Sequence, residues 1–273
     1  MTLLSWAKPF VERFPRVATA YRELRDSLDV TNAKVTPWGF SLAGNASMAN
    51  GTFEPEETEL VRRLLTDVDV LVNVGANVGY YCCHALSMGK GVIAFEPLPR
   101  NVRYLCANIK ANGWSCEIFP IALSDRVGIQ EIYGGDTGAS LVKGWAGSSE
   151  AYVTLVPSLT LDLALGTRLL GKKVLVVLDV EGAEKWVLDG SSILLANNPK
   201  PFWLMEIAVN ENQPDGLVTN PRLRATFQTM FDAGYFAFTG DRQMRPITGE
   251  DVISAERGDS AALETHNFLF CQT

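Results

Sequence analysis

The stretch V-L-V-N-V-G-A-N-V-G at residues 70–79 decides the fold of this chain, together with a second apolar run, V-I-A-F-E, at 92–96. The first run enters a glycine-spaced turn, and Gly75 and Gly79 carry no side chain that would keep backbone N–H groups from a bound ligand. The second run ends in Glu96. A carboxylate about 20 residues after the first glycine is placed to accept hydrogen bonds from both ribose hydroxyls. The pattern predicts a doubly wound α/β sheet that binds a nucleoside.

Asn77 decides between nucleoside ligands. A dinucleotide fingerprint reads G-x-G-x-x-G, and its second glycine lets a pyrophosphate touch the backbone. Here that position is Asn77, which suits a ligand without phosphate, such as S-adenosylmethionine with its carboxylate and amine. The alternative for the loop alone is a glycine turn that joins strand to helix for packing only.

Length and charge limit the classes of function. With 273 residues and a formal net charge of −7, the chain has enough sequence for one large α/β domain, and no lysine or arginine cluster occurs. Binding to a phosphate backbone depends on neutralising its charge, so we expect no nucleic acid partner. We divide the chain into an N-terminal helical and hairpin extension, residues 1–66, which packs on a core domain at 67–273.

The cysteines and the apolar runs indicate a cytoplasmic protein. Five cysteines occur, without a C-x-x-C pair, as in proteins that keep small buried thiols in a reducing compartment. The apolar run at the start of the chain is too short for the hydrophobic region of a signal peptide, and no run of about 18 apolar residues follows. We therefore expect no integral membrane segment.

Strand and helix patterns alternate along most of the chain, which implies parallel βαβ units with helices on both faces of the sheet. We expect seven strands, the last of them antiparallel, at residues 70–74, 91–95, 116–121, 173–179, 202–208, 235–239 and 267–271. Glycines mark a hairpin and a long loop between 127 and 156, and long loops in compact domains are usually functional. The part at 136–156, which contains Trp145, is a candidate cover for the substrate.

A second acidic segment, L-V-V-L-D-V-E-G-A-E at 175–184, ends a buried strand. Ligands in open α/β sheets occupy the crevice beyond the carboxyl ends of the strands, so Asp179 and Glu206, which end two neighbouring strands, are candidate catalytic residues. Such carboxylates act as a general base for a hydroxyl, or help to hold a divalent cation. His266 is a further candidate acid or base, whereas His84 is interpreted as a packed core residue. A metal site with histidine ligands is not expected from two histidines.

Taken together, these segments resemble the FkbM family of S-adenosylmethionine-dependent methyltransferases. The matching segments keep the order of that family over roughly residues 35–271, and they are G-F at 39–40, G-T-F-E-P-E at 51–56, V-N-V-G-A-N-V-G-Y-Y at 72–81, A-F-E-P at 94–97, A-L-S-D at 122–125, S-L-T-L-D at 158–162, L-D-V-E-G-A-E at 178–184, M-E at 205–206 and N-F-L-F at 267–270. The resemblance implies the class I methyltransferase fold, a Rossmann-like three-layer sandwich, and usually O-methylation of a hydroxyl on a secondary metabolite or a sugar.

The resemblance also implies which residues bind the cofactor. The glycine loop and Glu96 would hold methionine and ribose, and residues 122–125 would border the adenine. The full set of expected cofactor residues is Asn73, Gly75, Ala76, Asn77, Gly79, Glu96, Pro97, Asn101, Ala122, Leu123, Ser124, Asp125 and Asp179. Asn73 departs from the family, whose loop generally opens with Asp. Unlike a carboxylate, an amide offers no charge to the ammonium group of the cofactor.

The leading hypothesis is in-line transfer of a methyl group from S-adenosylmethionine to a hydroxyl on a small-molecule or glycan acceptor. Whether a magnesium ion joins Asp179 and Glu206 is left open. Two alternatives remain: an NAD(P)-dependent oxidoreductase, which Asn77 disfavours, and a non-catalytic S-adenosylmethionine-binding or scaffold protein, which Asn73 keeps in view. The sequence identifies neither the acceptor nor the oligomeric state.

Overall fold

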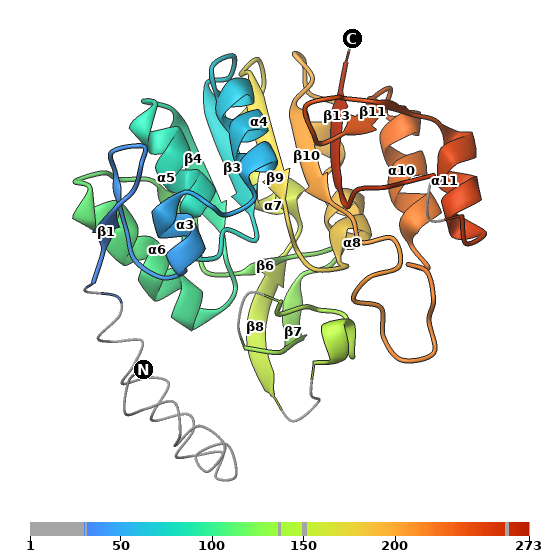
Figure 1. The fold of residues 1–273 in the computed structure, drawn as a ribbon, viewed down its shortest axis with the longest axis horizontal. Helices are drawn as coiled ribbons and strands as arrows, with labels where there is room; N and C mark the ends of the chain where they lie inside the picture. Colours follow the sequence, from blue (N-terminus) through green and yellow to red (C-terminus); the bar gives the residue numbers. More distant parts are fainter. Residues whose placement is uncertain (1–29, 31, 136–137, 149–151, 260–261, 273) are drawn as a thin grey trace.

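A computed structural model describes residues 30, 32–135, 138–148, 152–259 and 262–272. Its centre is an eight-stranded sheet in the order β12-β11-β13-β10-β9-β3-β4-β5, with helices on both faces (Figure 1). The strands of this sheet are β3 (Val70–Val74), β4 (Gly91–Phe95), β5 (Glu117–Phe119), β9 (Val174–Leu178), β10 (Phe202–Glu206), β11 (Phe236–Thr239), β12 (Pro246–Ile247) and β13 (Asn267–Cys271).

The middle of the sheet is buried on both faces, which is why its strands read as continuous apolar runs. All five residues of β3 and all five of β9 are buried, and the two strands pair in parallel. One face packs on α4 (Pro55–Leu65), α5 (Tyr80–Ser87) and α6 (Pro99–Ala111). The other packs on α7 (Leu161–Leu165), α8 (Glu184–Asp189), α9 (Ser192–Leu195), α10 (Leu223–Asp232) and α11 (Gly249–Glu256).

The predicted fold class is confirmed, with differences at the edges of the sheet. β13 runs antiparallel to both β10 and β11, as expected of the last strand. The strand count was one too low, because β12 adds an antiparallel edge next to β11. A strand of two residues is too short to show an alternating pattern in the sequence. The expected strand at 116–121 is shorter, and α7 ends at Leu165, where Gly166 leaves the helical conformation.

A second sheet of three strands, in the order β6-β8-β7, stands below the main sheet in Figure 1. Its strands are β6 (Ala122–Leu123), β7 (Gly128–Tyr133) and β8 (Val153–Leu159). β7 and β8 form the hairpin that the glycines of 127–156 predicted. A single-turn 3₁₀ helix, η1 (Trp145–Gly147), lies between them in the sequence.

The described part of the N-terminal extension is attached to α6. It contains β1 (Lys34–Val35), β2 (Ser41–Leu42) and α3 (Ala46–Asn50). The Asn108 amide accepts from the backbone N–H of Ala43 at 2.7 Å and donates to its carbonyl at 3.0 Å, and Asn112 makes the same pair of contacts with Ser41. Residues 1–29 and 31 of the predicted N-terminal extension lie outside the described residues, and the division at 66/67 stays a prediction.

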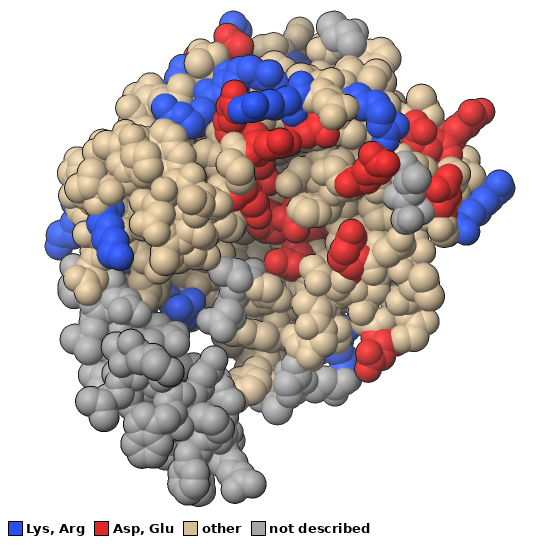
Figure 2. All heavy atoms as spheres, in the orientation of Figure 1, with Lys and Arg blue, Asp and Glu red and all other residues tan. Residues whose placement is uncertain are grey.

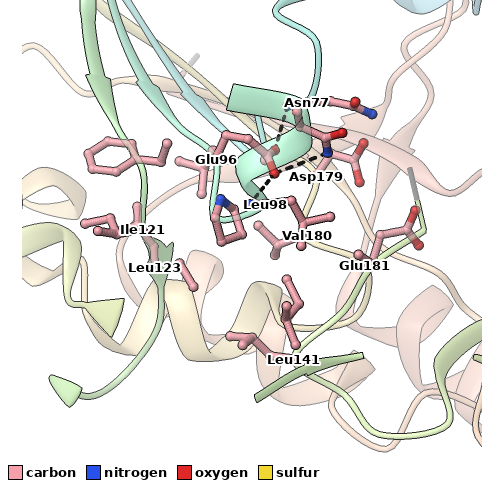
Figure 3. Close-up of a pocket in the computed structure, with 17 residues that line it drawn as sticks. Asn77, Glu96, Leu98, Ile121, Leu123, Leu141, Asp179, Val180 and Glu181 are labelled. Atoms are coloured by element: carbon pink, nitrogen blue, oxygen red, sulfur yellow. Dashed lines mark hydrogen bonds between the residues drawn. The ribbon is translucent and has the colours of Figure 1, made fainter. Parts of the chain in front are cut away.

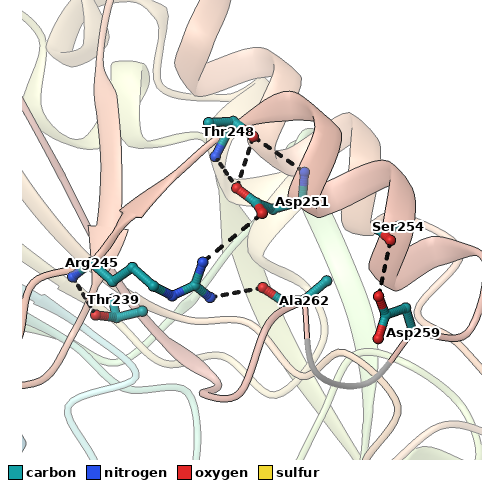
Figure 4. Close-up of polar contacts among 7 residues, drawn as sticks. All are labelled: Thr239, Arg245, Thr248, Asp251, Ser254, Asp259 and Ala262. Carbon is teal, nitrogen blue, oxygen red and sulfur yellow. Dashed lines mark hydrogen bonds and ion pairs between the residues drawn. The ribbon is translucent and has the colours of Figure 1, made fainter.

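Side-chain contacts cap α11 and join it to the segment that follows β11 (Figure 4). Thr248 accepts from the N–H of Asp251 and the Asp251 carboxylate accepts from the N–H of Thr248, which is a capping box. Arg245 donates to the carbonyl of Ala262 at 2.8 Å and faces Asp251 across 3.9 Å. These contacts join the turn after β11 to the helix that follows it.

Candidate functional site

The glycine turn after β3 brings the carboxyl ends of β3 and β9 together. Gly75 has φ +81°, and a Cβ on it would lie 1.7 Å from the carbonyl oxygen of Asp179. Gly79 has φ +87°, and a Cβ there would lie 2.3 Å from a methyl carbon of Leu105 on α6. Only glycine fits at these positions. The space that a side chain would need at Gly75 and Gly79 is therefore occupied by Asp179 and Leu105 of the chain itself.

Glu96 is held at the end of β4 by three donors (Figure 3). It is 4% exposed, and its carboxylate accepts from the N–H of Asn77 at 2.8 Å, the N–H of Leu98 at 2.9 Å and the Asn101 amide at 3.2 Å. Burial raises the pKa of Glu96, and the three hydrogen bonds oppose that rise. The oxygen facing Asn77 takes one of these bonds and the other oxygen takes two. Each carboxylate oxygen has two lone pairs, so the oxygen facing Asn77 keeps room for a ligand hydroxyl.

A pocket connects Glu96 to Asp179 and Glu181, and apolar side chains such as Ile121 and Leu141 form its wall (Figure 3). The expected site residues that line it are Gly75, Asn77, Glu96, Pro97, Asn101, Ala122, Leu123 and Asp179. The expected residues that are absent from its lining are Asn73, Ala76, Gly79, Ser124, Asp125, Glu206 and His266. Residues of the three-stranded sheet and of the main sheet thus line the pocket together.

Asp179 belongs to a group of carboxylates at the ends of β9 and β10. One of its oxygens is buried without a hydrogen-bond partner in the described part of the chain. Burial raises its pKa well above the ordinary value, and the negative charges of Glu206 and Glu181 add to the rise. Burial, followed by the charges of Glu181 and Glu54, raises the pKa of Glu206 to about 9. Figure 2 shows Asp and Glu side chains gathered across the middle of this face.

The two histidines differ in their surroundings. His266 is exposed, just before β13, and its carbonyl accepts from the N–H of Ile207 at 2.6 Å. Burial raises the pKa of Glu181, and the hydrogen bond from Trp145 and the electrostatic effect of His266 oppose that rise. His84 is fully buried against Arg62, and burial with that positive charge lowers its pKa to about 3. His84 is therefore a core residue, as the sequence indicated.

Glu181 and Trp145 were missed as a pair by sequence reasoning. The Trp145 indole donates to the Glu181 carboxylate at 2.7 Å, and Trp145 is only 2% exposed. Its ring fills the place where a Cβ on Gly182 would stand, 2.4 Å from the nearest ring atom. The expected cover at 136–156, of which residues 136–137 and 149–151 lie outside the described ranges, contributes Ala139 and Leu141 to the pocket. Trp145 itself is a buried anchor. The glycine after Glu181 was the only hint of this contact.

Residues 73–236 match the Methyltransferase FkbM domain. This chain belongs to the FkbM methyltransferase family. The matched region contains the glycine turn, Glu96, Asp179 and Glu206, so the family resemblance of the sequence is confirmed. A search of curated proteins by sequence finds no match to this FkbM methyltransferase.

Three solved structures resemble parts of this FkbM methyltransferase at low identity. Precorrin-6y C5,15-methyltransferase from Geobacter metallireducens has 12% identity and a TM-score of 0.37, covering 66% of this chain and 72% of its own. Fibrillarin from Aeropyrum pernix, with bound S-adenosyl-L-methionine, has 14% identity and a TM-score of 0.38, covering 74% and 65%. An O-methyltransferase family protein from Burkholderia thailandensis has 12% identity and a TM-score of 0.37, covering 83% and 57%. Likenesses of this size say nothing about the acceptor.

Three expected cofactor residues that do not line the pocket have contacts within this FkbM methyltransferase. Asn73 is 2% exposed inside β3, where its side-chain oxygen accepts from the Cys82 thiol at 3.3 Å. Asp125 accepts from Ser124 at 2.9 Å and pairs with Arg126. Ala76 is buried on the side of α4 to α6.

The magnesium hypothesis receives no support from the geometry. Among the residues that the structure describes, no three His, Cys, Asp or Glu side chains are grouped so that they could hold a metal ion. In the same described ranges, no helix is long and apolar enough to span a membrane.

Proposed function

We propose that this FkbM methyltransferase binds S-adenosylmethionine in the pocket between Glu96 and Asp179, and methylates a hydroxyl group on a secondary metabolite or a sugar. The observation that carries the proposal is the pairing of these two carboxylates across one apolar-walled pocket. The free acceptor capacity of Glu96 fits a ribose hydroxyl, and the wall that includes Ile121 and Leu123 fits an adenine ring. The unpartnered oxygen of Asp179 fits a donor that the protein does not supply.

The bound cofactor supplies a sulfonium methyl group, which passes to the acceptor oxygen and leaves a thioether. Asp179 takes the proton that the acceptor hydroxyl loses as its new bond to carbon forms. A base is most effective when its pKa lies near the working pH, and burial beside Glu206 moves the pKa of Asp179 in that direction. Glu206, whose pKa is raised to about 9 mainly by burial, is a further catalytic carboxyl group in this proposal. His266 is the second proton acceptor that we propose at this edge.

Positioning accounts for most of the rate in this proposal. Holding donor and acceptor in line contributes about 7–11 kcal/mol, whereas a placed base contributes a factor of about 10²–10⁴, or roughly 3–5 kcal/mol. Loss of Asp179 is therefore expected to slow the reaction without removing the cofactor, and loss of Glu96 to weaken cofactor binding directly.

Calorimetry with two variants tests these roles. We expect wild type to bind S-adenosylmethionine and not NAD, and Glu96→Ala to lose about 10-fold or more in affinity, as for a hydrogen bond to a charged group. Asp179→Asn should bind within a few-fold of wild type, but its transfer of labelled methyl into an extract should fall by about 10²–10⁴. Asp67→Asn, at an exposed position, is the control. Equal losses of affinity in both site variants would refute the assignment of roles.

Two other outcomes point to the alternative functions. Retention of NAD in place of S-adenosylmethionine would indicate an oxidoreductase. Binding of S-adenosylmethionine without any labelled product would indicate a non-catalytic binding protein. We also propose a cytoplasmic location, supported by five free thiols at positions 82, 83, 106, 116 and 271, because disulfides are rare in reducing compartments.

A further inference from the structure

The cofactor that we propose carries an α-ammonium group, and the strand beside its pocket offers that group no charge. Asn73, the polar residue of β3, is neutral, buried and bonded to Cys82. Any carboxylate that binds the ammonium group therefore comes from an element other than β3. The inference below rests on the proposed function.

Glu57 is a buried carboxylate with a vacant oxygen. It lies in the first turn of α4, before the matched domain at residues 73–236, and is 7% exposed. One of its oxygens accepts from the Tyr81 hydroxyl at 2.7 Å. The other oxygen is buried and has no hydrogen-bond partner among the described residues. A buried charge without a partner is costly unless a ligand completes it.

Two contacts fix Glu57 beside the glycine turn. Its own bond to Tyr81 is one, and the pairing of the Thr58 and Tyr80 hydroxyls at 3.2 Å is the other. Tyr80 and Tyr81 open α5 directly after Gly79. The first turn of α4 is thus docked on the first turn of the helix that the glycine turn begins.

The charged groups with the largest effects on Glu57 are carboxylates. Burial is the largest cause of its raised pKa, and the charges of Glu54 and Asp179 act in the same direction, whereas the hydrogen bond from Tyr81 opposes the rise. Asp179 lines the pocket. No lysine or arginine in the described ranges forms an ion pair with Glu57, Glu54 or Asp179. A cationic ligand group next to these carboxylates would relieve their repulsion.

We propose that Glu57, oriented by Tyr81, binds the α-ammonium group of the methionine moiety of S-adenosylmethionine. The assignment gives the vacant oxygen of Glu57 a charged donor, and it places the methionine end of the cofactor over the start of α5. Asp179 then remains available to the acceptor hydroxyl. Glu57 acts on binding and takes no part in moving the methyl group.

Two ligands that differ in the amino acid part separate this role from a structural one. S-adenosylhomocysteine carries the ammonium group, and 5′-methylthioadenosine lacks the whole amino acid. Calorimetry is expected to show that Glu57→Gln loses about 10-fold to 100-fold in affinity for S-adenosylhomocysteine, as for a hydrogen bond between charged groups. Its affinity for 5′-methylthioadenosine should stay within about twofold of wild type, because this ligand has no ammonium group. A twofold change corresponds to a free energy of RT ln 2, which is below the smallest net contribution of a hydrogen bond. Glu56→Gln, an exposed neighbour in the same turn, should change neither value.

The outcomes distinguish this inference from the proposed function. Failure of wild type to bind S-adenosylhomocysteine would refute the proposed function. Binding by wild type together with unchanged affinity in Glu57→Gln, or equal losses for both ligands, would refute the role of Glu57 alone. If Glu57→Gln does not fold, Tyr81→Phe takes its place, because it removes the orienting donor and keeps the carboxylate. That variant should lose affinity for S-adenosylhomocysteine and not for 5′-methylthioadenosine, and the reverse would overturn the proposal.

Discussion

Replacing Gly75 by alanine is expected to destabilise the protein through a collision with the neighbouring strand. The new Cβ would lie 1.7 Å from the carbonyl oxygen of Asp179, whereas ordinary contact begins at 3.4 Å. The end of β9 must therefore retreat by most of the difference. The cost has two parts: about 1–2 kcal/mol for a side chain at φ +81°, and about 1–3 kcal/mol or more for overpacking a rigid site. We expect the free energy of unfolding to fall by about 3 kcal/mol or more.

Gly113→Ala isolates the first part of that cost, the backbone penalty. Gly113 has φ +70°, and nothing lies within 4 Å of its added Cβ, so this variant has only the backbone penalty, about 1–2 kcal/mol. Urea unfolding of the two variants and wild type gives the difference directly. If Gly75→Ala is no less stable than Gly113→Ala, the close approach of the turn to Asp179 is wrong.

Three further predictions concern other parts of the molecule. The pKa of Glu206 in the folded state is raised to about 9. Between the ordinary pKa of a glutamate and pH 9, the folded state therefore keeps a proton on Glu206 that the unfolded state has released. The stabilisation is complete below that ordinary value and is lost as the pH rises to 9, so the free energy of unfolding should fall over this range by up to about 1.4 kcal/mol per pH unit. Glu206→Gln should flatten the slope in pH-dependent urea titrations and the exposed Glu256→Gln should not; equal slopes would contradict this. Trp145→Phe removes the bond to Glu181 and should cost about 1.5–3 kcal/mol in the same assay, while a loss below about 0.5 kcal/mol would argue that the bond is absent in solution. Thr248→Ala removes the cap of α11 and should cost about 1 kcal/mol without changing cofactor affinity; an unchanged stability would show that the cap is not formed.

The sequence predicted the centre of the fold because apolar runs and glycines report local structure. The runs at 70–74 and 174–178 are buried on both faces, and apolar runs that alternate with helices are typical of parallel strands. The same logic placed Glu96 and Asp179 at strand ends, and both line the pocket. Family order then indicated the reaction class, which the matched domain confirms.

The remaining features depend on contacts between distant segments. Trp145 reaches Glu181 across 36 positions and Glu57 reaches Tyr81 across 24, and no periodicity reports such pairs. The two-residue β12 carries no pattern of its own. The glycine at 75 was recognised, but the sequence does not show that its missing side chain makes room for the backbone of Asp179.

A crystal structure of the protein grown with S-adenosylhomocysteine tests the central claim most directly. We predict adenosine in the pocket between the two sheets, with its ribose hydroxyls about 2.5–3.0 Å from the Glu96 carboxylate. A ligand bound elsewhere, or a pocket that the Asn77 side chain fills in the presence of saturating ligand, would contradict the account.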